Sequence, residues 1–364
     1  MSRSFGLQLV PGPVPVPAEV LAAREVDYPS ADLEPEFFAL YETVQGQLQR
    51  IMGTAHSPVI MLGEAMVVLW GAMRSCVAPG DRVLAVSTGL FGEGFAEMAR
   101  GLGADVRLLA FGDDEAADPD RVEAEVQAFR PRLVTAVHCE TPSGVLNPVA
   151  EIGARLERHG VELYLVDAVA SIGGAPLDTD AARIDLCLLG TQKCLAAPPD
   201  LGIVAVSPRA WEAVARVGYQ GYDALAPFAD AVAQRLFPYT HSWHALAGLQ
   251  VACRLLLEEG LEAAYERHRR AAALCRRRGR ERGLDLFPRQ EAAASPTVTT
   301  FRVPPALGWP ELDRRLRRRG LVVGGNYGRL AGQTFRIGHM GTQADEGLVA
   351  RAMELVAEAL QEGP

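Results

Sequence analysis

One stretch of the chain reads Thr191-Gln192-Lys193-Cys194-Leu195-Ala196-Ala197-Pro198-Pro199 and places a lysine shortly after an apolar run. That run, at residues 186–189, predicts a buried strand, and a Gly-Thr-Gln turn separates the strand from Lys193. A lysine is costly to place at the mouth of a buried strand, because burial disfavours its charge. An amine in such a position is often an activated nucleophile that forms a Schiff base with a carbonyl compound. Lys193 is therefore the first candidate catalytic residue.

A carboxylate ends a second apolar run of the same kind, Leu163-Tyr164-Leu165-Val166-Asp167. If both runs are parallel strands of one sheet, Asp167 and Lys193 lie together at its carboxyl edge, where α/β proteins bind ligands. Pyridoxal chemistry needs an acid beside a ring nitrogen and a lysine beside an aldehyde. The two residues therefore predict a pyridoxal-dependent enzyme in which Lys193 and Asp167 are catalytic.

Composition restricts the other classes of function. The chain has 364 residues, of which 49% are hydrophobic, and this length and composition indicate a large core and two domains. Its net charge is -9. An acidic chain disfavours nucleic acid as a partner, and no stretch approaches the ~18 apolar residues of a membrane span. The six cysteines form no CxxC pair, and we interpret them as reduced, buried thiols of a cytoplasmic protein. His241 and His244 lack an evident third ligand, so no metal site is expected.

Apolar strands alternate with helices over most of the chain. The expected strands are 58–62, 83–87, 106–111, 133–138, 163–167, 186–189 and 202–206, and the expected helices are 35–52, 65–75, 95–102, 119–129 and 149–158. This alternation predicts a mostly parallel sheet with helices on both faces. Beyond residue 246, a long arginine-rich helical segment and shorter strands indicate a smaller α+β domain. We expect a proline-rich extended arm at 1–17, a large cofactor-binding domain at 18–245 and a small domain at 246–364.

Several motifs occur in a defined order along the chain. They are His138-Cys139-Glu140-Thr141-Pro142-Ser143-Gly144-Val145-Leu146-Asn147-Pro148, the Asp167 strand with Ala170-Ser171-Ile172-Gly173-Gly174, and the segments 192–199 and 334–341. Together they resemble the class V, fold-type I pyridoxal phosphate aminotransferases, and in particular the alanine–glyoxylate aminotransferase group. The resemblance covers nearly the whole chain. It implies a transferase that moves an amino group from a small amino acid or amine to a 2-oxo acid such as pyruvate or glyoxylate. Asp200 departs from the family, which usually has glycine after Pro-Pro.

The resemblance also implies roles for individual residues. Lys193 resembles the Schiff-base lysine that also moves the substrate proton, and Asp167 resembles the carboxylate that keeps the pyridine nitrogen protonated. Arg336 resembles the arginine that clamps the substrate carboxylate. The other implied cofactor contacts are Gly63, Glu64 and Ala65 at a helix start, Phe91 and Val169 on the two ring faces, Thr141 at the ring hydroxyl, and Gln192 and Thr240 at the phosphate. Because the Thr240 segment of the family reaches the neighbouring subunit, a homodimer with shared active sites is implied.

Glu64 is the informative departure from this pattern. The alanine–glyoxylate group has a glycine–serine–glycine type turn here, which binds the cofactor phosphate at a helix N-terminus. Two like unit charges 4 Å apart repel by roughly 4 kcal/mol at an effective dielectric of 20, so a glutamate facing the phosphate would weaken its binding. A glutamate is also simply favourable in a first helical turn.

The turn with Glu64 also resembles pyridoxamine–pyruvate aminotransferase, which takes the unphosphorylated vitamer as its substrate. Tyr327 stands where that enzyme has a second arginine, and Gln192 matches the phosphate-binding relatives. Three functions stay open at this point. They are a pyridoxal phosphate-dependent aminotransferase, a transaminase that uses free pyridoxal or pyridoxamine as substrate, and a pyridoxal phosphate-dependent lyase of the same fold.

Overall fold

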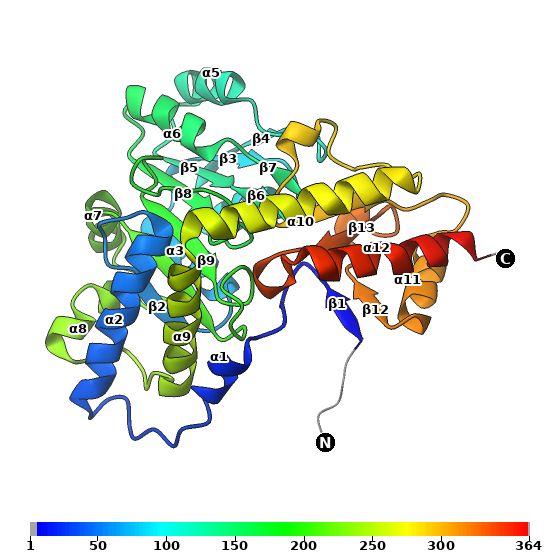
Figure 1. Ribbon diagram of the computed structural model, residues 1–364. Helices are drawn as coiled ribbons and strands as arrows, with labels where there is room; N and C mark the ends of the chain where they lie inside the picture. The colour runs from blue at the N-terminus through cyan, green and yellow to red at the C-terminus, as the bar shows by residue number, and fades with distance from the viewer. Residues whose placement is uncertain (1–5, 363–364) are drawn as a thin grey trace.

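A seven-stranded sheet lies at the centre of the protein (Figure 1). The computed structural model describes residues 6–362, so the first five residues of the expected arm lie outside the described part. The strand order is β2-β10-β9-β8-β5-β3-β4. The strands are β2 (Val59–Leu62), β3 (Arg82–Ser87), β4 (Asp105–Ala110), β5 (Leu133–Val137), β8 (Leu163–Asp167), β9 (Leu186–Gly190) and β10 (Leu201–Val206). Only β10 runs antiparallel to its neighbours in this sheet, which confirms the mostly parallel sheet expected from the sequence.

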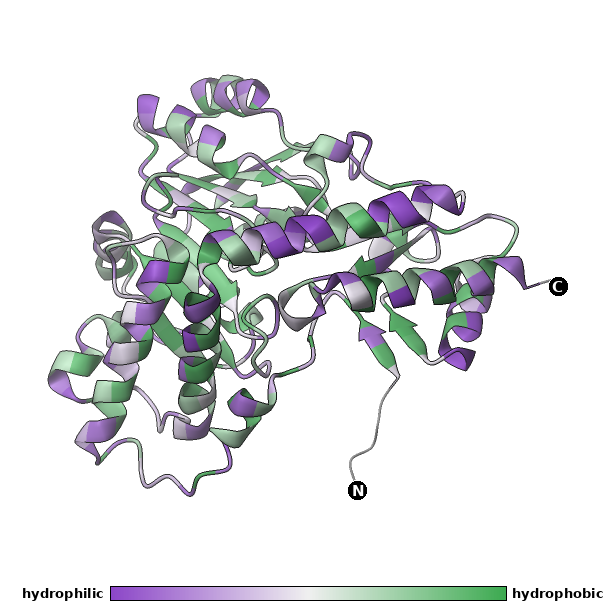
Figure 2. Cartoon of the chain, viewed as in Figure 1, coloured by the Kyte–Doolittle hydropathy of each residue, from purple (hydrophilic) through white to green (hydrophobic). Residues whose placement is uncertain are grey.

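Helices pack around this sheet and bury its apolar strands (Figure 1). They are α2 (Pro35–Met52), α3 (Met66–Cys76), α4 (Leu90–Gly101), α5 (Pro119–Phe129), α6 (Val149–Arg158), α7 (Pro208–Val217), α8 (Ala231–Gln234) and α9 (Trp243–Glu259), while α1 (Ala18–Ala22) packs on α9. Local chemistry sets several starts: proline opens α2 and α5, and Ser207 and Ser242 cap α7 and α9 with their side chains. Figure 2 shows hydrophobic residues along the central strands and hydrophilic residues along the outer helices.

A second, separate hydrophobic core lies in the C-terminal part of the chain. It is formed by α10 (Leu261–Glu281), α11 (Trp309–Arg318) and α12 (Glu346–Gln361) with β11 (Val298–Arg302), β12 (Leu321–Val323) and β13 (Thr334–Gly338). The N-terminal segment joins this core, because β1 (Leu7–Leu9) pairs in parallel with β12 and buries Leu9. The N-terminal segment that was expected to be extended is thus held against the C-terminal part of the chain by strand pairing.

The long helical segment expected beyond residue 246 consists of two helices. Gly260 separates α9 from α10 with a φ of 86°, a backbone conformation that glycine adopts without strain. The buried face of α9 belongs to the core of the large sheet, which extends to Ala264. The division expected at 245/246 falls inside α9, and we propose that it lies near Ala264.

Two further expectations concern the surface and the thiols. All six cysteines are buried and free, as the sequence indicated. No helix within residues 6–362 is long and apolar enough to cross a membrane.

Candidate active site

The carboxyl ends of neighbouring strands bring the predicted catalytic residues to one edge of the sheet. Strand β8 ends at Asp167, and β9 ends at Gly190, three residues before Lys193. Strand β2 runs in the same direction as β9, since both are antiparallel to β10, and it ends just before Gly63. Parallel strands expose their last residues at a common edge, so this edge is where a ligand can be surrounded by several loops.

Lys193 is the single lysine of the sequence, whereas the other 35 of the 36 lysine and arginine residues are arginine. Its side chain is largely enclosed, and Nζ donates a hydrogen bond to the carbonyl oxygen of Pro11. Burial and the nearby Arg336 guanidinium lower the pKa of Lys193. A lowered pKa increases the fraction of neutral amine, which is the nucleophilic form and one that arginine cannot supply. Among the basic residues, only lysine can therefore supply a neutral, nucleophilic amine at this position.

Asp167 is buried beside Lys193, and its Oδ2 has no hydrogen-bond partner among residues 6–362. Its Oδ1 accepts a hydrogen bond from the backbone N–H of Val169 at 2.9 Å. Burial raises the pKa of Asp167 to about 6, although the Val169 N–H and the Lys193 ammonium oppose this shift. A protonated ring nitrogen at the free oxygen would hold the carboxylate in its ionised form.

Two buried polar atoms at this edge have no hydrogen-bond partner within residues 6–362, namely His138 Nδ1 and Gln192 Oε1. Burial also lowers the pKa of His138 to about 4, so its ring is neutral at physiological pH. Buried polar groups are nearly always paired, and an orphan at a sheet edge points to a polar ligand. The residues therefore fit a pyridoxal compound. No three His, Cys, Asp or Glu side chains of the described chain form a group that could hold a metal ion.

Glu64 lies at the N-terminus of α3, in the turn where the related enzymes are expected to bind the cofactor phosphate. Its Oε1 accepts the backbone N–H of Met66 at 2.9 Å, and its Oε2 accepts the Nε2 of Gln192 at 3.1 Å. Gly63 and Ala65 flank the carboxylate, with the Gly63 N–H bonded to the Asp200 carbonyl at 2.9 Å. The turn expected to bind a phosphate thus lies at the start of α3, and the Glu64 carboxylate accepts hydrogen bonds from the Met66 N–H and the Gln192 amide there.

Phe91 lies in the first turn of a helix and not in the expected loop, because α4 begins at Leu90 and not at residue 95. The reason is Glu140, whose carboxylate accepts the N–H groups of Phe91 at 3.0 Å and Gly92 at 3.3 Å. Burial raises the pKa of Glu140 to about 8. A Cβ atom at Gly89 would lie 2.6 Å from Glu140 Cγ, so the turn closes tightly on this acid.

Glu140 positions the first turn of α4, a role that the sequence motifs did not predict. The signal that could have indicated it is an acid that follows an otherwise apolar strand. It belongs to β6 (Cys139–Glu140), which pairs with β7 (Val145–Leu146). Thr141 follows it directly and is buried, and Val169 is buried one turn beyond Asp167. Both therefore follow elements that end near this edge of the sheet, and their expected cofactor contacts stay predictions.

Arg336 is buried on β13, and no carboxylate within residues 6–362 forms a salt bridge with it. Its Nε and Nη2 donate to the Gly325 carbonyl at 3.0 and 2.7 Å, and its Nη1 donates to Tyr327 Oη at 3.3 Å. The guanidinium also lies over the Tyr327 ring, 4.7 Å from its centroid. Burial lowers the pKa of Arg336. A buried guanidinium without an acidic partner is suited to bind an anionic ligand.

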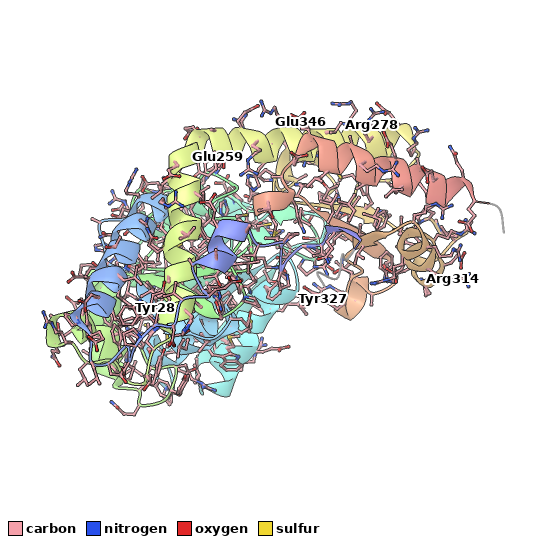
Figure 3. The ribbon with its side chains drawn as sticks, turned by 60° about the horizontal axis from the view of Figure 1, so that its bottom comes forward. Tyr28, Glu259, Arg278, Arg314, Tyr327 and Glu346 are labelled. Carbon is pink, nitrogen blue, oxygen red and sulfur yellow. The ribbon has the colours of Figure 1, made fainter. Side chains whose placement is uncertain are left out.

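Tyr327 lies where the two bodies of the protein meet (Figure 3). Together with Leu90, Glu140 and Pro142 it lines a cavity of about 190 Å³. Arg329 closes this cavity by forming ion pairs with Glu93 and Asp113 of the larger body. This ionic contact, which the sequence did not indicate, holds the Tyr327 segment against α4.

Thr240 does not join this cluster within the chain. It is exposed before α9, and its Oγ1 donates to Asp32 Oδ2 at 2.8 Å. Its expected contact with a phosphate therefore depends on a second subunit.

Comparison with known proteins identifies the family. The profile of the Aminotransferase class-V family matches residues 29–329. The chain belongs to the class V aminotransferases. It is 35% identical over 352 residues to pyridoxamine–pyruvate transaminase of Mesorhizobium japonicum, covering 93% of this chain and 87% of that protein. It is 31% identical over 367 residues to alanine–glyoxylate aminotransferase of Callithrix jacchus, covering 98% and 88% of the two chains.

A solved structure of this family supports the same architecture. Pyridoxamine–pyruvate aminotransferase from Mesorhizobium loti superposes with a TM-score of 0.94 at 31% identity, covering 100% of this chain and 95% of that one. The class V fold with its mostly parallel central sheet is thereby confirmed.

Proposed function

We propose that this class V enzyme is a pyridoxal phosphate-dependent aminotransferase that moves an amino group from a small amino acid or amine to a 2-oxo acid such as pyruvate or glyoxylate. The observation that carries the proposal is the single lysine, Lys193, which lies near the buried acid Asp167 and the buried Arg336, a guanidinium with no acidic partner within residues 6–362. The names of the relatives agree with amino transfer between small acids, since they include alanine–glyoxylate and pyridoxamine–pyruvate enzymes.

Each residue has a chemical task in this reaction. The pyridoxal group, when bound, supplies an electron sink for the negative charge that develops at the substrate carbon. Asp167 would hold the protonated ring nitrogen of the bound group, and neutral Lys193 Nζ takes and returns the proton at the substrate carbon as general base. Arg336 binds the substrate carboxylate through its remaining N–H groups, and Tyr327 limits the space beside it. Phe91 and Val169 would exclude water from the two faces of the bound ring.

We further propose that the active form is a homodimer with shared sites. Within residues 6–362, the three most exposed large hydrophobic residues are Leu33, Leu236 and Tyr222, at 77%, 66% and 62% exposure. All three lie close to Thr240 along the chain or through contacts, because Leu33 adjoins Asp32, Leu236 precedes Thr240 in one loop, and Tyr222 stacks on Tyr239 at 4.7 Å. An exposed apolar patch of this kind is typical of a protein interface.

One experiment tests both statements. Purified protein with pyridoxal phosphate and a ¹⁵N-labelled amino donor should convert pyruvate or glyoxylate into ¹⁵N-alanine or ¹⁵N-glycine, detected by mass spectrometry. Sedimentation of the active species under the same conditions should give the mass of two chains. Release of labelled ammonia without labelled acceptor would establish a lyase, and an active single chain would exclude the shared site.

A second candidate function is favoured by one observation, the occupation of the phosphate turn by Glu64. Its carboxylate already accepts the Met66 N–H and the Gln192 amide, so a phosphate dianion would have to displace it and be repelled by it. A neutral 5′-hydroxyl could instead donate a hydrogen bond to the same carboxylate. In this alternative the protein is a transaminase whose substrate is free pyridoxal or pyridoxamine.

Glu64→Ser is expected to increase affinity for pyridoxal phosphate relative to free pyridoxal by about tenfold or more, because it removes the charge repulsion at the helix start. The measurement is a titration of wild type and variant with each vitamer, followed by absorbance. Glu64→Gln is the matched variant, because glutamine keeps the size of the side chain and removes its charge. It should also shift the preference toward pyridoxal phosphate. The wild-type preference decides between the two candidates. If the wild type prefers pyridoxal phosphate and neither variant changes the ratio, Glu64 is only a helix-start residue and the phosphate-dependent function stands.

A further inference from the structure

A proline-rich strap, defined as residues 10–15 (Val10-Pro11-Gly12-Pro13-Val14-Pro15), crosses the active site from one body of the protein to the other. It connects β1, which is paired with β12, to α1, which packs on α9 (Figure 1). Val14 N–H donates to the Gln192 carbonyl at 3.1 Å, and Thr342 Oγ1 donates to the Pro15 carbonyl at 2.6 Å. These two hydrogen bonds hold the C-terminal end of the strap, and the pairing of β1 with β12 holds the chain just before its N-terminal end.

The middle of the strap touches the lysine itself. The Pro11 carbonyl accepts the hydrogen bond of Lys193 Nζ. A Cβ atom at Gly12 would lie 2.6 Å from Lys193 Cδ and 2.9 Å from Nζ, and Gly12 has a φ of +83°. Only glycine satisfies both conditions, because any side chain would overlap the lysine and strain the backbone.

The same segment also lies next to the proposed carboxylate-binding residue. A Cβ atom at Gly324 would be 2.7 Å from Pro11 Cδ and 3.6 Å from Arg336 Nε. Gly324 and Arg336 exchange two backbone hydrogen bonds of 2.9 and 2.7 Å. Pro11 is thus positioned beside both Lys193 and the backbone that carries Arg336.

We propose that the strap is part of the active site and that Pro11 and Gly12 are positioning residues for Lys193. A neutral amine has two N–H bonds and one lone pair, and donation of one N–H to the Pro11 carbonyl limits rotation of Nζ. The lone pair is then directed away from the strap, toward the space where a carbonyl compound would react. The Gly12 backbone meanwhile shields the amine from water. The contact stands independently of the reaction, whereas its catalytic role depends on the proposed function.

The single lysine makes a direct test possible. Full-length protein, freed of bound vitamer with hydroxylamine and dialysis, is treated with trinitrobenzenesulfonate over a range of pH. Peptide mass spectrometry then follows Lys193 separately from the N-terminal amine. The reagent attacks the neutral amine, so the rate rises with pH to a limit that measures access and has a midpoint that measures the pKa. Because burial and Arg336 lower the pKa of Lys193, the wild-type midpoint should lie below the ordinary value of 10.5.

Gly12→Ala should displace the strap and increase the limiting rate by about tenfold or more, with a midpoint shifted to higher pH as water reaches the amine. Gly80→Ala is the matched control, because Gly80 has a φ of +82°, against +83° at Gly12, and no atom within 4 Å of its Cβ position. Both substitutions place an alanine at nearly the same positive φ, but only the alanine at residue 12 would meet Lys193. The control should keep the wild-type rate and midpoint.

A folded Gly12→Ala protein with wild-type rate and midpoint would overturn the proposal. If Gly12→Ala does not fold, as judged by its melting transition, Thr342→Val replaces it as the test. That variant removes only the hydrogen bond to Pro15, so an increased limiting rate supports the strap and an unchanged rate refutes it. Absence of amino transfer together with the expected lysine reactivity would count against the proposed function alone.

Discussion

Lys193→Arg is expected to abolish amino transfer and the covalent attachment of the vitamer. Arginine keeps the positive charge and approximate length, but its pKa is too high for it to serve as a neutral amine. Loss of a positioned proton-transfer group should lower kcat by about 10³-fold or more. In wild type, borohydride with pyridoxal phosphate should label one internal peptide, the one that contains Lys193. The variant should show no internal label, as measured by peptide mass spectrometry.

A control can separate the position of the lysine from its mere presence. Arg351 is exposed on α12 and lies 158 residues after Lys193 in the sequence. It forms an ion pair with Glu354 at 3.1 Å. The double variant Lys193→Arg/Arg351→Lys again contains one lysine, but at the surface. It should remain inactive and should not retain the vitamer after gel filtration without borohydride. Activity in either variant would show that another group performs the chemistry.

Arg336→Ala is expected to reduce kcat/KM for the 2-oxo acid by about 30-fold to several-thousand-fold, which corresponds to ~2–5 kcal/mol for a desolvated charge pair. Arg336→Lys should recover part of this loss, because it restores the charge but not the planar pair of donors. The measurement is steady-state kinetics with pyruvate or glyoxylate as the varied substrate.

Two comparisons make this result specific. Tyr327→Phe removes the hydrogen bond to Nη1 but keeps the ring over the guanidinium, so its effect should be less than about tenfold. A donor that has no carboxylate should react with its half-reaction rate nearly unchanged in Arg336→Ala. An equal loss with and without a carboxylate would show that Arg336 maintains the fold of the site and does not bind the substrate.

Local sequence predicted the elements whose ends are set by neighbouring residues. The helices Pro35–Met52, Pro119–Phe129 and Val149–Arg158 have the expected bounds, since proline, aspartate and the apolar period act within one or two turns. The start of α4 was misplaced because Glu140, which satisfies its first N–H groups, is 49 residues away from Phe91. No local pattern near residue 90 contains that information.

The sequence by itself determined the mostly parallel sheet and the candidate pair Asp167 and Lys193, because each residue directly or closely follows a buried strand whose apolar run is continuous. Only the tertiary structure decided how the surrounding groups are used. It turned Glu64 toward Met66 and Gln192, and it brought Pro11 to Lys193 across a separation of 182 residues. Strand patterns depend on burial of adjacent residues, whereas the contacts of Glu64 with Gln192 and of Pro11 with Lys193 depend on how segments 128 and 182 residues apart fold together around one sheet edge.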